Sequence, residues 1–311
     1  MVSVRLAAVL CALIAQAVWA APLAYVVNEK SATISVVDTA DDRRIGEVAV
    51  GRRPRGAAGD GRFLYVTDAQ AGALMVVEGA TGTVLRTIAV GASPEGVSLS
   101  ADGRWLAVAV EDDNSVVLVA ADGNRVVARI PVQGRNPEHA VFSPDGRWLL
   151  VSAEEAEQVD VVDVAARRQV ASIGVGKRPR GIGFVADGSR AYVACELAGK
   201  VYAIDLASRR VVAEIVVGQY PNGIAVTPDG RRVFVSNGRD GTVMAIDTER
   251  NAVVATIPVG KRPWNMAVTP DGSKLYVANG RSNSVSIIDA VALKRLLELE
   301  VGELPWGVTV R

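Results

Sequence analysis

The sequence predicts an all-β protein, a closed ring of seven four-stranded antiparallel sheets, and three observations support this prediction. An Asp-Gly pair precedes the second strand of six repeats, and short alternating apolar runs lie between the turns. A period in the forties with β-rich content is typical of propeller blades, so we expect a seven-bladed β-propeller. The phrase that sets this period, Gly-x-x-Pro, recurs at intervals of 40 to 43 residues, starting at Gly51, Gly91, Gly134, Gly176, Gly218, Gly260 and Gly302.

The first twenty residues have the pattern of a secretion signal and lie outside the repeats. Arg5 gives a basic start, residues 6–18 are apolar, and cleavage after Ala20 would follow small residues. An apolar run of about thirteen residues is too short to span a bilayer. We therefore predict a signal peptide at residues 1–20 and a single propeller domain at residues 21–311. The protein is expected in the periplasm, without membrane association after cleavage.

Composition and charge narrow the partners of the mature chain. Hydrophobic residues make up 50% and aromatic residues 5%, which suits layers of Val, Ile and Ala between stacked sheets. Without residues 1–20, 33 basic groups face 34 acidic ones, which argues against nucleic acid or an anionic membrane as partner. Cys195 is the only cysteine left, so no internal disulfide can form, and we expect a buried packing residue.

The repeat that begins at Gly218 shows the elements in order. A loop over residues 218–223 leads into the first strand. Pro228-Asp229-Gly230 predicts the next turn, because Pro presets φ and Gly accepts a positive φ. Four strands are expected, at residues 224–226, 233–236, 242–246 and 253–259.

The two ends of the mature chain predict how the ring closes. Residues 24–28 form a second strand with no first strand before it, and residues 307–310 form a first strand with nothing after it. One blade is therefore expected to combine both ends, which removes two open sheet edges.

Three segments carry a family resemblance: Ala24–Asn28, Val233–Asn237 and Leu275–Asn279, each followed by a bend and a strand ending in Asp. They resemble the YVTN repeat of bacterial and archaeal seven-bladed propellers, and the resemblance covers the whole mature chain. More narrowly, an exported chain of seven such repeats that opens on a second strand is similar to periplasmic propeller proteins associated with pyrroloquinoline quinone (PQQ)-dependent alcohol catabolism. The resemblance implies a setting, an accessory role in alcohol oxidation, and no particular reaction.

The loop between each Gly and the first strand is the best candidate for a binding site, because it reaches the mouth of the central channel. Cationic side chains there would hold a carboxylate, and tryptophans would offer a stacking wall. Alternatively, the tryptophans fill gaps between blades and the cations form a solvated rim. The predicted ligand-binding residues are Arg52, Arg55, Lys177, Arg180, Asn222, Arg262, Trp264 and Trp306.

Catalytic patterns are few. His139 is the only histidine, so a multi-histidine metal site or a catalytic triad is not expected. We predict a non-enzymatic protein without a cofactor that binds a small anionic molecule or a periplasmic protein partner. Two alternatives stay open. A propeller lactonase or hydrolase would need several inward carboxylate or Asn ligands for a metal at one level of the channel. A pure docking platform would show a contiguous apolar patch.

Overall fold

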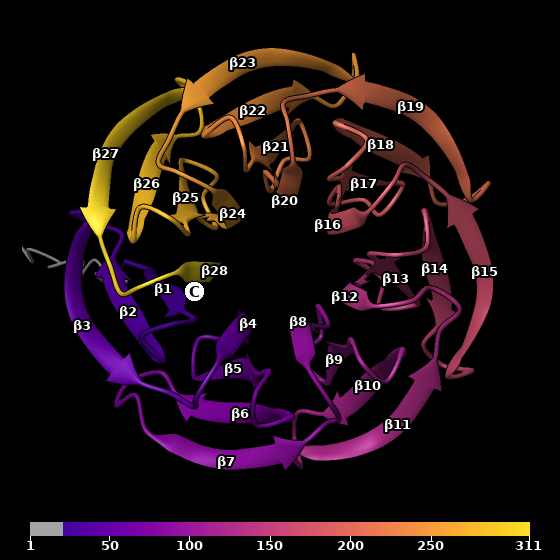
Figure 1. Cartoon of the computed structure of the whole chain (residues 1–311), viewed down its shortest axis with the longest axis horizontal. Helices are drawn as coiled ribbons and strands as arrows, with labels where there is room; N and C mark the ends of the chain where they lie inside the picture. The colour runs from indigo at the N-terminus through magenta and orange to yellow at the C-terminus, as the bar shows by residue number, and fades with distance from the viewer. Residues whose placement is uncertain (1–20) are drawn as a thin grey trace, which may run out of the picture.

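The computed structural model describes residues 21–311, which form seven antiparallel sheets arranged as a ring around a central opening (Figure 1). Each sheet has four strands, so the predicted seven-bladed β-propeller is confirmed. The predicted signal peptide, residues 1–20, lies outside the described residues. Within residues 21–311, no helix has the length and apolar character needed to cross a bilayer.

The two inner strands of each blade run along the channel and directly behind it (Figure 1). The innermost strands, each opening on a proline, are β4 (Pro54–Gly59), β8 (Pro94–Leu99), β12 (Pro137–Phe142), β16 (Pro179–Phe184), β20 (Pro221–Val226), β24 (Pro263–Val268) and β28 (Pro305–Val310). The second strands are β1 (Leu23–Asn28), β5 (Phe63–Asp68), β9 (Trp105–Val110), β13 (Trp148–Ala153), β17 (Arg190–Cys195), β21 (Arg232–Asn237) and β25 (Lys274–Asn279).

The outer half of each blade consists of a third strand and an edge strand. The third strands are β2 (Thr33–Asp38), β6 (Ala73–Glu78), β10 (Ser115–Ala120), β14 (Gln158–Asp163), β18 (Lys200–Asp205), β22 (Thr242–Asp247) and β26 (Ser284–Asp289). The edge strands are β3 (Arg43–Ala49), β7 (Val84–Ala89), β11 (Arg125–Pro131), β15 (Arg168–Gly174), β19 (Arg210–Val216), β23 (Ala252–Pro258) and β27 (Lys294–Glu300). Blade 1 joins β28 to β1–β3, and blades 2 to 7 follow in chain order.

The ring closes in blade 1, as the sequence predicts. Strands β1 and β28 are antiparallel neighbours, with Ala24 opposite Val310 and Val26 opposite Val308. Two more backbone hydrogen bonds extend this pairing, from Leu23 N to Arg311 O at 2.7 Å and from Arg311 N back to Leu23 O at 2.9 Å. Because β1 and β28 pair with each other, the edges along which the two chain ends meet are hydrogen-bonded and not open.

The innermost strands begin earlier than predicted. In blade 6 the strand starts at Pro221, three residues before the expected residue 224, because a strand can begin on a proline that needs no ladder donor. Pro221 lies opposite Asn237, and the register then shifts before Ile224 pairs with Val235. A β-bulge of this kind turns a side chain in a new direction. The residue after each proline, the predicted binding position, lies in this irregular stretch.

Apolar side chains from neighbouring blades pack face to face and form the core. Cys195 is fully buried in one such layer with Val193 and Ile204, as predicted. Burial raises the pKa of its thiol to about 12, so the thiolate is not formed at neutral pH.

Around the channel, the innermost strands approach one another so closely that glycine is required. A Cβ on Gly56 would lie 2.7 Å from the carbonyl oxygen of Glu95, and one on Gly181 would lie 2.5 Å from that of Asn222. His139 and Asn265 occupy the equivalent positions in blades 4 and 7. The backbones of neighbouring innermost strands are therefore in direct contact at most of the joints between blades.

Candidate functional site at the channel mouth

Two kinds of connection meet on one face of the ring, which we call the mouth face. The Gly-x-x-Pro loops lie beside the bends that follow the second strands, as the hydrogen bond from Glu196 N to Arg178 O at 2.8 Å shows. The Asp-Gly turns lie on the opposite face, which we call the turn face. Each blade has one bend on the mouth face, and its first residue differs around the ring. In order from blade 1 to blade 7, these residues are Glu29, Ala69, Glu111, Glu154, Glu196, Gly238 and Gly280.

Arg180 is the centre of a buried ion-pair network over blades 4 and 5. Its guanidinium contacts Glu138 and Glu154, and Nη2 lies 2.8 Å from Oε2 of Glu196. Burial opposes the charge of Arg180, but the carboxylates of Glu138, Glu196 and Glu154 outweigh it and raise the pKa of the guanidinium. Burial raises the pKa of Glu154 as well. Arg180 is therefore engaged by carboxylates of its own chain.

Arg55 is held in a similar way over blades 1 to 3. Its Nη1 lies 2.8 Å from Oε2 of Glu95, and its Nη2 lies 3.3 Å from Oε1 of Glu29. Burial raises the pKa of Glu95 to about 8, although Arg55 acts in the opposite direction. The seven residues that form this network and the previous one are called the charge-paired region: Glu29, Arg55, Glu95, Glu138, Glu154, Arg180 and Glu196.

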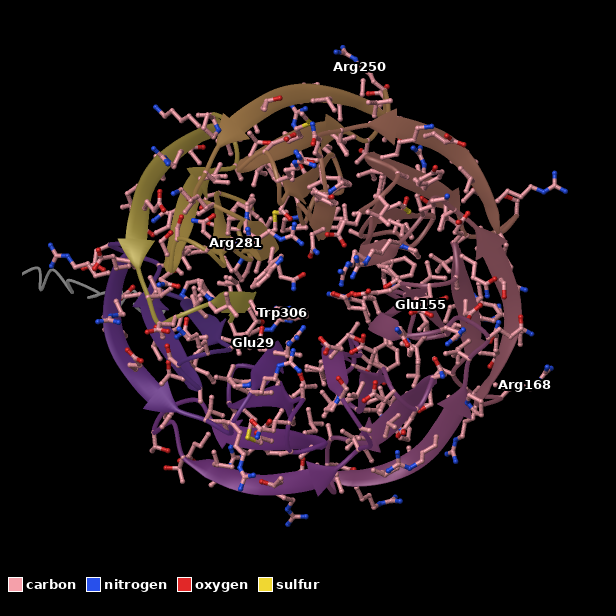
Figure 2. All side chains as sticks on the ribbon, viewed as in Figure 1. Glu29, Glu155, Arg168, Arg250, Arg281 and Trp306 are labelled. Carbon is pink, nitrogen blue, oxygen red and sulfur yellow. The ribbon has the colours of Figure 1, made fainter. Side chains whose placement is uncertain are left out.

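The predicted aromatic wall is divided between two environments. Trp306 is 5% exposed and stacks on His139, with ring centroids 5.8 Å apart, at the edge of the central opening (Figure 2). Trp264 is half-buried and lies against Gly280, where a Cβ would come within 2.5 Å of its ring. Asn222 is buried. The geometry thus gives Trp306 and Trp264 packing contacts within the ring.

A small cavity of about 130 Å³ lies inside the channel next to Trp306. His139 and Asn265 line it, at the two positions where the inner ring lacks its glycine. Burial lowers the pKa of His139 to about 4, so this imidazole is neutral at pH 7. The cavity has room for water or a very small molecule.

A much larger hollow, of about 900 Å³, opens on the mouth face over blades 6 and 7, and we call it the open pocket. Five basic side chains line it against three acidic ones, together with the ring of Tyr220. The charged lining residues are Arg178, Arg239, Lys261, Arg262, Arg281, Glu196, Asp240 and Glu298. Figure 2 places Arg281 on the inner side of blade 7.

Beside the open pocket, the bends of blades 6 and 7 carry glycine where those of blades 1, 3, 4 and 5 carry glutamate. A Cβ on Gly238 would lie only 3.2 Å from Nη1 of Arg262, so this guanidinium occupies space that a larger bend residue would need. Arg262 and Arg239 both lie over the ring of Tyr220, at 5.5 and 5.7 Å from its centroid. Arg262 also contacts Glu196 at 2.9 Å, which links the open pocket to the charge-paired region.

Three cations of the open pocket keep their charge free of internal acids. Within residues 21–311, Arg239, Lys261 and Arg281 have no carboxylate at ion-pair distance. Among the predicted ligand-binding residues, Arg262 lies in this pocket, whereas Arg52 and Lys177 are exposed on other loops. The sequence prediction did not include Arg239 and Arg281. The two consecutive bends that carry glycine instead of glutamate were the signal that could have located them.

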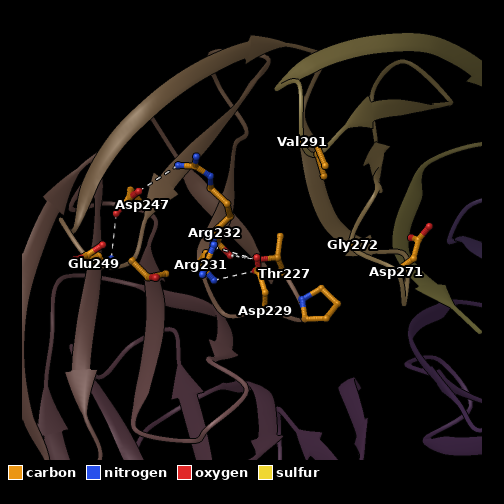
Figure 3. Close-up of a pocket in the computed structure, with 12 residues that line it drawn as sticks. Thr227, Asp229, Arg231, Arg232, Asp247, Glu249, Asp271, Gly272 and Val291 are labelled. Atoms are coloured by element: carbon orange, nitrogen blue, oxygen red, sulfur yellow. Dashed lines mark hydrogen bonds and ion pairs between the residues drawn. The ribbon is translucent and has the colours of Figure 1, made fainter.

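Another hollow, of about 750 Å³, lies on the turn face between blades 6 and 7 (Figure 3). Its three aspartates, Asp229, Asp247 and Asp271, are engaged by neighbouring groups of the scaffold. Oδ1 of Asp229 accepts the backbone N–H of Arg231 at 3.0 Å, and Asp247 pairs with Arg232 at 3.4 Å. Equivalent turn contacts recur in other blades, so this hollow reflects the scaffold and is not our candidate site.

Across residues 21–311, no group of three or more His, Cys, Asp or Glu side chains is arranged to hold a metal ion. The carboxylates of the channel mouth are instead arranged around guanidinium groups.

Comparisons with known proteins give the family. A family model described as "Lactonase, 7-bladed beta-propeller" matches residues 17–170 and 165–310. No curated protein matches the sequence. Three solved structures share the fold at low identity: hydrazine synthase from Kuenenia stuttgartiensis (24% identity, 85% of this chain and 91% of that chain covered, TM-score 0.78), a functionally unknown protein from Desulfotomaculum acetoxidans DSM 771 (17% identity, 93% of this chain and 98% of that chain covered, TM-score 0.81), and dihydro-heme d1 dehydrogenase NirN in complex with DHE (18% identity, 92% of this chain and 74% of that chain covered, TM-score 0.66). Because the match to the family model covers nearly the whole chain, the protein belongs to the seven-bladed β-propeller lactonase family.

Proposed function

We propose that this protein is an exported, non-enzymatic propeller that binds a small polyanion in the open pocket and serves PQQ-dependent alcohol oxidation in the periplasm. The observation that carries the binding proposal is the set of three cations, Arg239, Lys261 and Arg281, without an internal acid in the described chain. The pattern of residues 1–20 supports export, and the resemblance to YVTN-repeat propellers supports the setting.

The chemistry of the open pocket favours a planar polycarboxylate. Guanidinium groups bind carboxylates through two parallel hydrogen bonds, and Lys261 adds a flexible point charge. Tyr220 supplies an aromatic surface beside them. PQQ is a planar molecule with three carboxylates, and a volume of about 900 Å³ is within the range of small-molecule sites. PQQ is therefore the first ligand to test.

The cations of the charge-paired region have a different part in this proposal. Arg55 would have to release Glu29, and Arg180 would have to release Glu196, before they could bind an external anion, and separating a buried ion pair is costly. The exposed Arg52 and Lys177 can still attract an anion toward the mouth face over a longer distance. We assign the direct contacts to Arg262, Arg239, Lys261 and Arg281.

Calorimetry on the mature protein tests this assignment with PQQ and with citrate. The double variant Arg239→Gln/Arg281→Gln removes two charge-assisted contacts and should weaken binding by on the order of a hundredfold. Arg250→Gln is the matched control, because Arg250 lies on the outer edge of the ring (Figure 2). The proposal is wrong if the native protein binds neither compound or if the double variant binds equally well. Docking of a protein partner would then be the better hypothesis for this face.

Family membership favours lactone hydrolysis as a second candidate function. Glu95 gives it a chemical basis, because a buried carboxyl with a pKa of about 8 is protonated at neutral pH and could act as a general acid. Hydrolysis of a lactone series, with and without added divalent metal, is the test. Glu95→Gln should abolish any turnover that depends on this carboxyl, and unchanged turnover would exclude Glu95 as the acid.

A further inference from the structure

A second cleft with a distinct chemistry lies on the turn face between blades 3 and 4. It has a volume of about 330 Å³, and Trp105, Leu118 and Val164 form its apolar floor. Leu118 belongs to the hydrophobic core of these two blades, and Trp105 and Val164 pack against it. Three arginines surround the floor: Arg104, Arg147 and Arg167.

The next joint in the ring shows how such a cleft is normally closed. Trp148 opens the second strand of blade 4, as Trp105 does in blade 3. Its ring lies between two guanidinium groups, with Arg147 at 4.5 Å and Arg209 at 4.6 Å from the centroid. Arg209 belongs to the turn between the third strand and the edge strand of blade 5. The neighbouring blade therefore covers Trp148.

At the joint between blades 3 and 4, the corresponding cover is missing. Arg167 occupies the same turn position as Arg209, and both have a left-handed backbone, with φ of 53° and 54°. The guanidinium of Arg167, however, donates to the carbonyl oxygen of Val127 at 3.3 Å. Only Arg104 lies over Trp105, at the longer distance of 6.0 Å. One aromatic surface at this joint thus stays available.

The charges at this joint are also unmatched. In the described part of the chain, Arg104, Arg147 and Arg167 have no carboxylate at ion-pair distance. The joint between blades 7 and 1 satisfies its cation internally, since Lys274 contacts Asp42 at 2.8 Å. Three guanidinium groups around an apolar floor with an open indole are complementary to an anion that has a flat apolar body.

We propose that this cleft binds a planar aromatic monocarboxylate, with its ring on Trp105 and its carboxylate among Arg104, Arg147 and Arg167. Stacked aromatic rings and guanidinium–carboxylate pairs both favour this pose. A volume of about 330 Å³ is at the lower end of the range for ligand sites, which suits one or two fused rings. The cleft lies on the opposite face from the open pocket, so the two sites are independent.

The test uses 2-naphthoate as the probe and 2-naphthylmethanol as its neutral counterpart, each titrated into the mature protein by calorimetry. Native protein should bind the carboxylate at least tenfold more tightly than the alcohol. Arg104→Gln/Arg147→Gln should weaken binding of the carboxylate by on the order of tenfold or more. Arg168→Gln is the matched control, because Arg168 is next to Arg167 in sequence but points outward at the edge of the ring (Figure 2). It should leave affinity unchanged.

Further variants separate the cleft from the open pocket and from folding defects. Arg239→Gln/Arg281→Gln should leave binding of 2-naphthoate unchanged. Trp105→Phe keeps an aromatic floor and should retain binding, whereas Trp105→Ala should lose it, with melting temperatures reporting whether each variant folds. The proposal is overturned if native protein does not bind 2-naphthoate, if it binds the alcohol equally well, or if the mouth-face variant alone loses binding.

Discussion

The charge-paired region and the open pocket lie side by side on one face of one ring and have opposite properties. In the charge-paired region, acidic side chains from the bends and from the innermost strands pair with Arg55 and Arg180 and are largely buried. Beside the open pocket, glycine stands at the bend positions of blades 6 and 7, and several cations face solvent. Whether a loop cation stabilises the fold or stays available to a ligand thus depends on the acidic side chains that neighbouring loops and bends place beside it.

Backbone geometry does not cause this difference, because both regions share it. The residue before the loop proline has a left-handed backbone in most loops, irrespective of region. Positive φ at a non-glycine residue is often a sign of a functional site. Here it belongs to the repeated loop itself, and the affected residues are Ser93, Asn136, Arg178, Tyr220, Arg262 and Leu304.

The largest effect is expected from opening the ring on which both regions depend. Deleting residues 307–311 removes most of β28 and leaves β1 without its partner. We expect aggregation or a large loss of thermal stability, because two sheet edges become exposed. Thermal unfolding and size-exclusion chromatography measure the outcome. An unchanged melting transition would show that the two ends do not depend on each other.

The next largest effect is expected at Glu196, which connects the two regions. Its carboxylate contacts Arg178, Arg180 and Arg262, and its side chain is 2% exposed. Glu196→Ala removes the ion-pair partner of Arg262 and one of the carboxylates that compensate the buried charge of Arg180. It should cost about 3–5 kcal/mol of the free energy of unfolding. Urea denaturation measures this loss.

Glu298→Ala is the control for that prediction. Glu298 lines the other side of the open pocket and pairs with Arg295 at 3.2 Å in a more exposed setting. Its removal should cost no more than about 1 kcal/mol. Equal losses for the two variants would contradict the distinction between a structural region and an open one.

A third experiment gives the open pocket an acidic bend residue like those of the charge-paired region. Gly238→Glu places a carboxylate where the bend of blade 5 has Glu196. The Cβ of the new residue would lie 3.2 Å from Nη1 of Arg262 and 3.3 Å from the carbonyl oxygen of Tyr220, so both must shift slightly. Binding of PQQ or citrate should weaken by on the order of tenfold, since the new carboxylate competes for Arg262 and its neighbours. Gly238→Gln has the same size without the charge and serves as control. If both variants weaken binding equally, crowding rather than charge is responsible.

The charge-paired region should also make stability depend on pH. Burial raises the pKa of Glu95 from about 4.5 to about 8, so the folded protein holds this proton more tightly than the unfolded chain. Its contribution to stability therefore falls as the pH rises from about 4.5 to about 8 and is constant above that range. Glu95→Gln should reduce this decline in melting temperatures between pH 5 and pH 8. Parallel curves for the native protein and the variant would refute this assignment, and the exposed Glu155→Gln is the control.

The smallest effect, close to zero, is expected from reducing agents. Cys195 is fully buried, and its thiol has a pKa of about 12. Melting temperatures with and without a thiol reductant should agree. A covalent dimer on non-reducing electrophoresis would show that this thiol is accessible, contrary to its position in the core.

The sequence was sufficient for the architecture because the signals of a repeat protein are local and recur. The Asp-Gly turns and the split blade predicted the strands and the closure, while the start of strands such as β20 was missed because Pro221 was assigned to a loop. The sequence also grouped the charged loops on one face, where Arg262 lines the open pocket, and their role in binding stays a prediction. The partners of Arg55 and Arg180 could not be assigned, since they come from other loops and bends and depend on side-chain direction at a β-bulge.

The glycines of the inner ring limit how this molecule can be changed. Since a Cβ on Gly56 would lie only 2.7 Å from the carbonyl oxygen of Glu95, the spacing of the innermost strands, and with it the bore of the channel, is set at most joints by the thickness of the polypeptide backbone. Larger residues on the innermost strands would push blades apart before they reshaped the bore. Anyone who wishes to give this scaffold a new specificity should therefore diversify the mouth-face loops and bends and leave the innermost strands as they are.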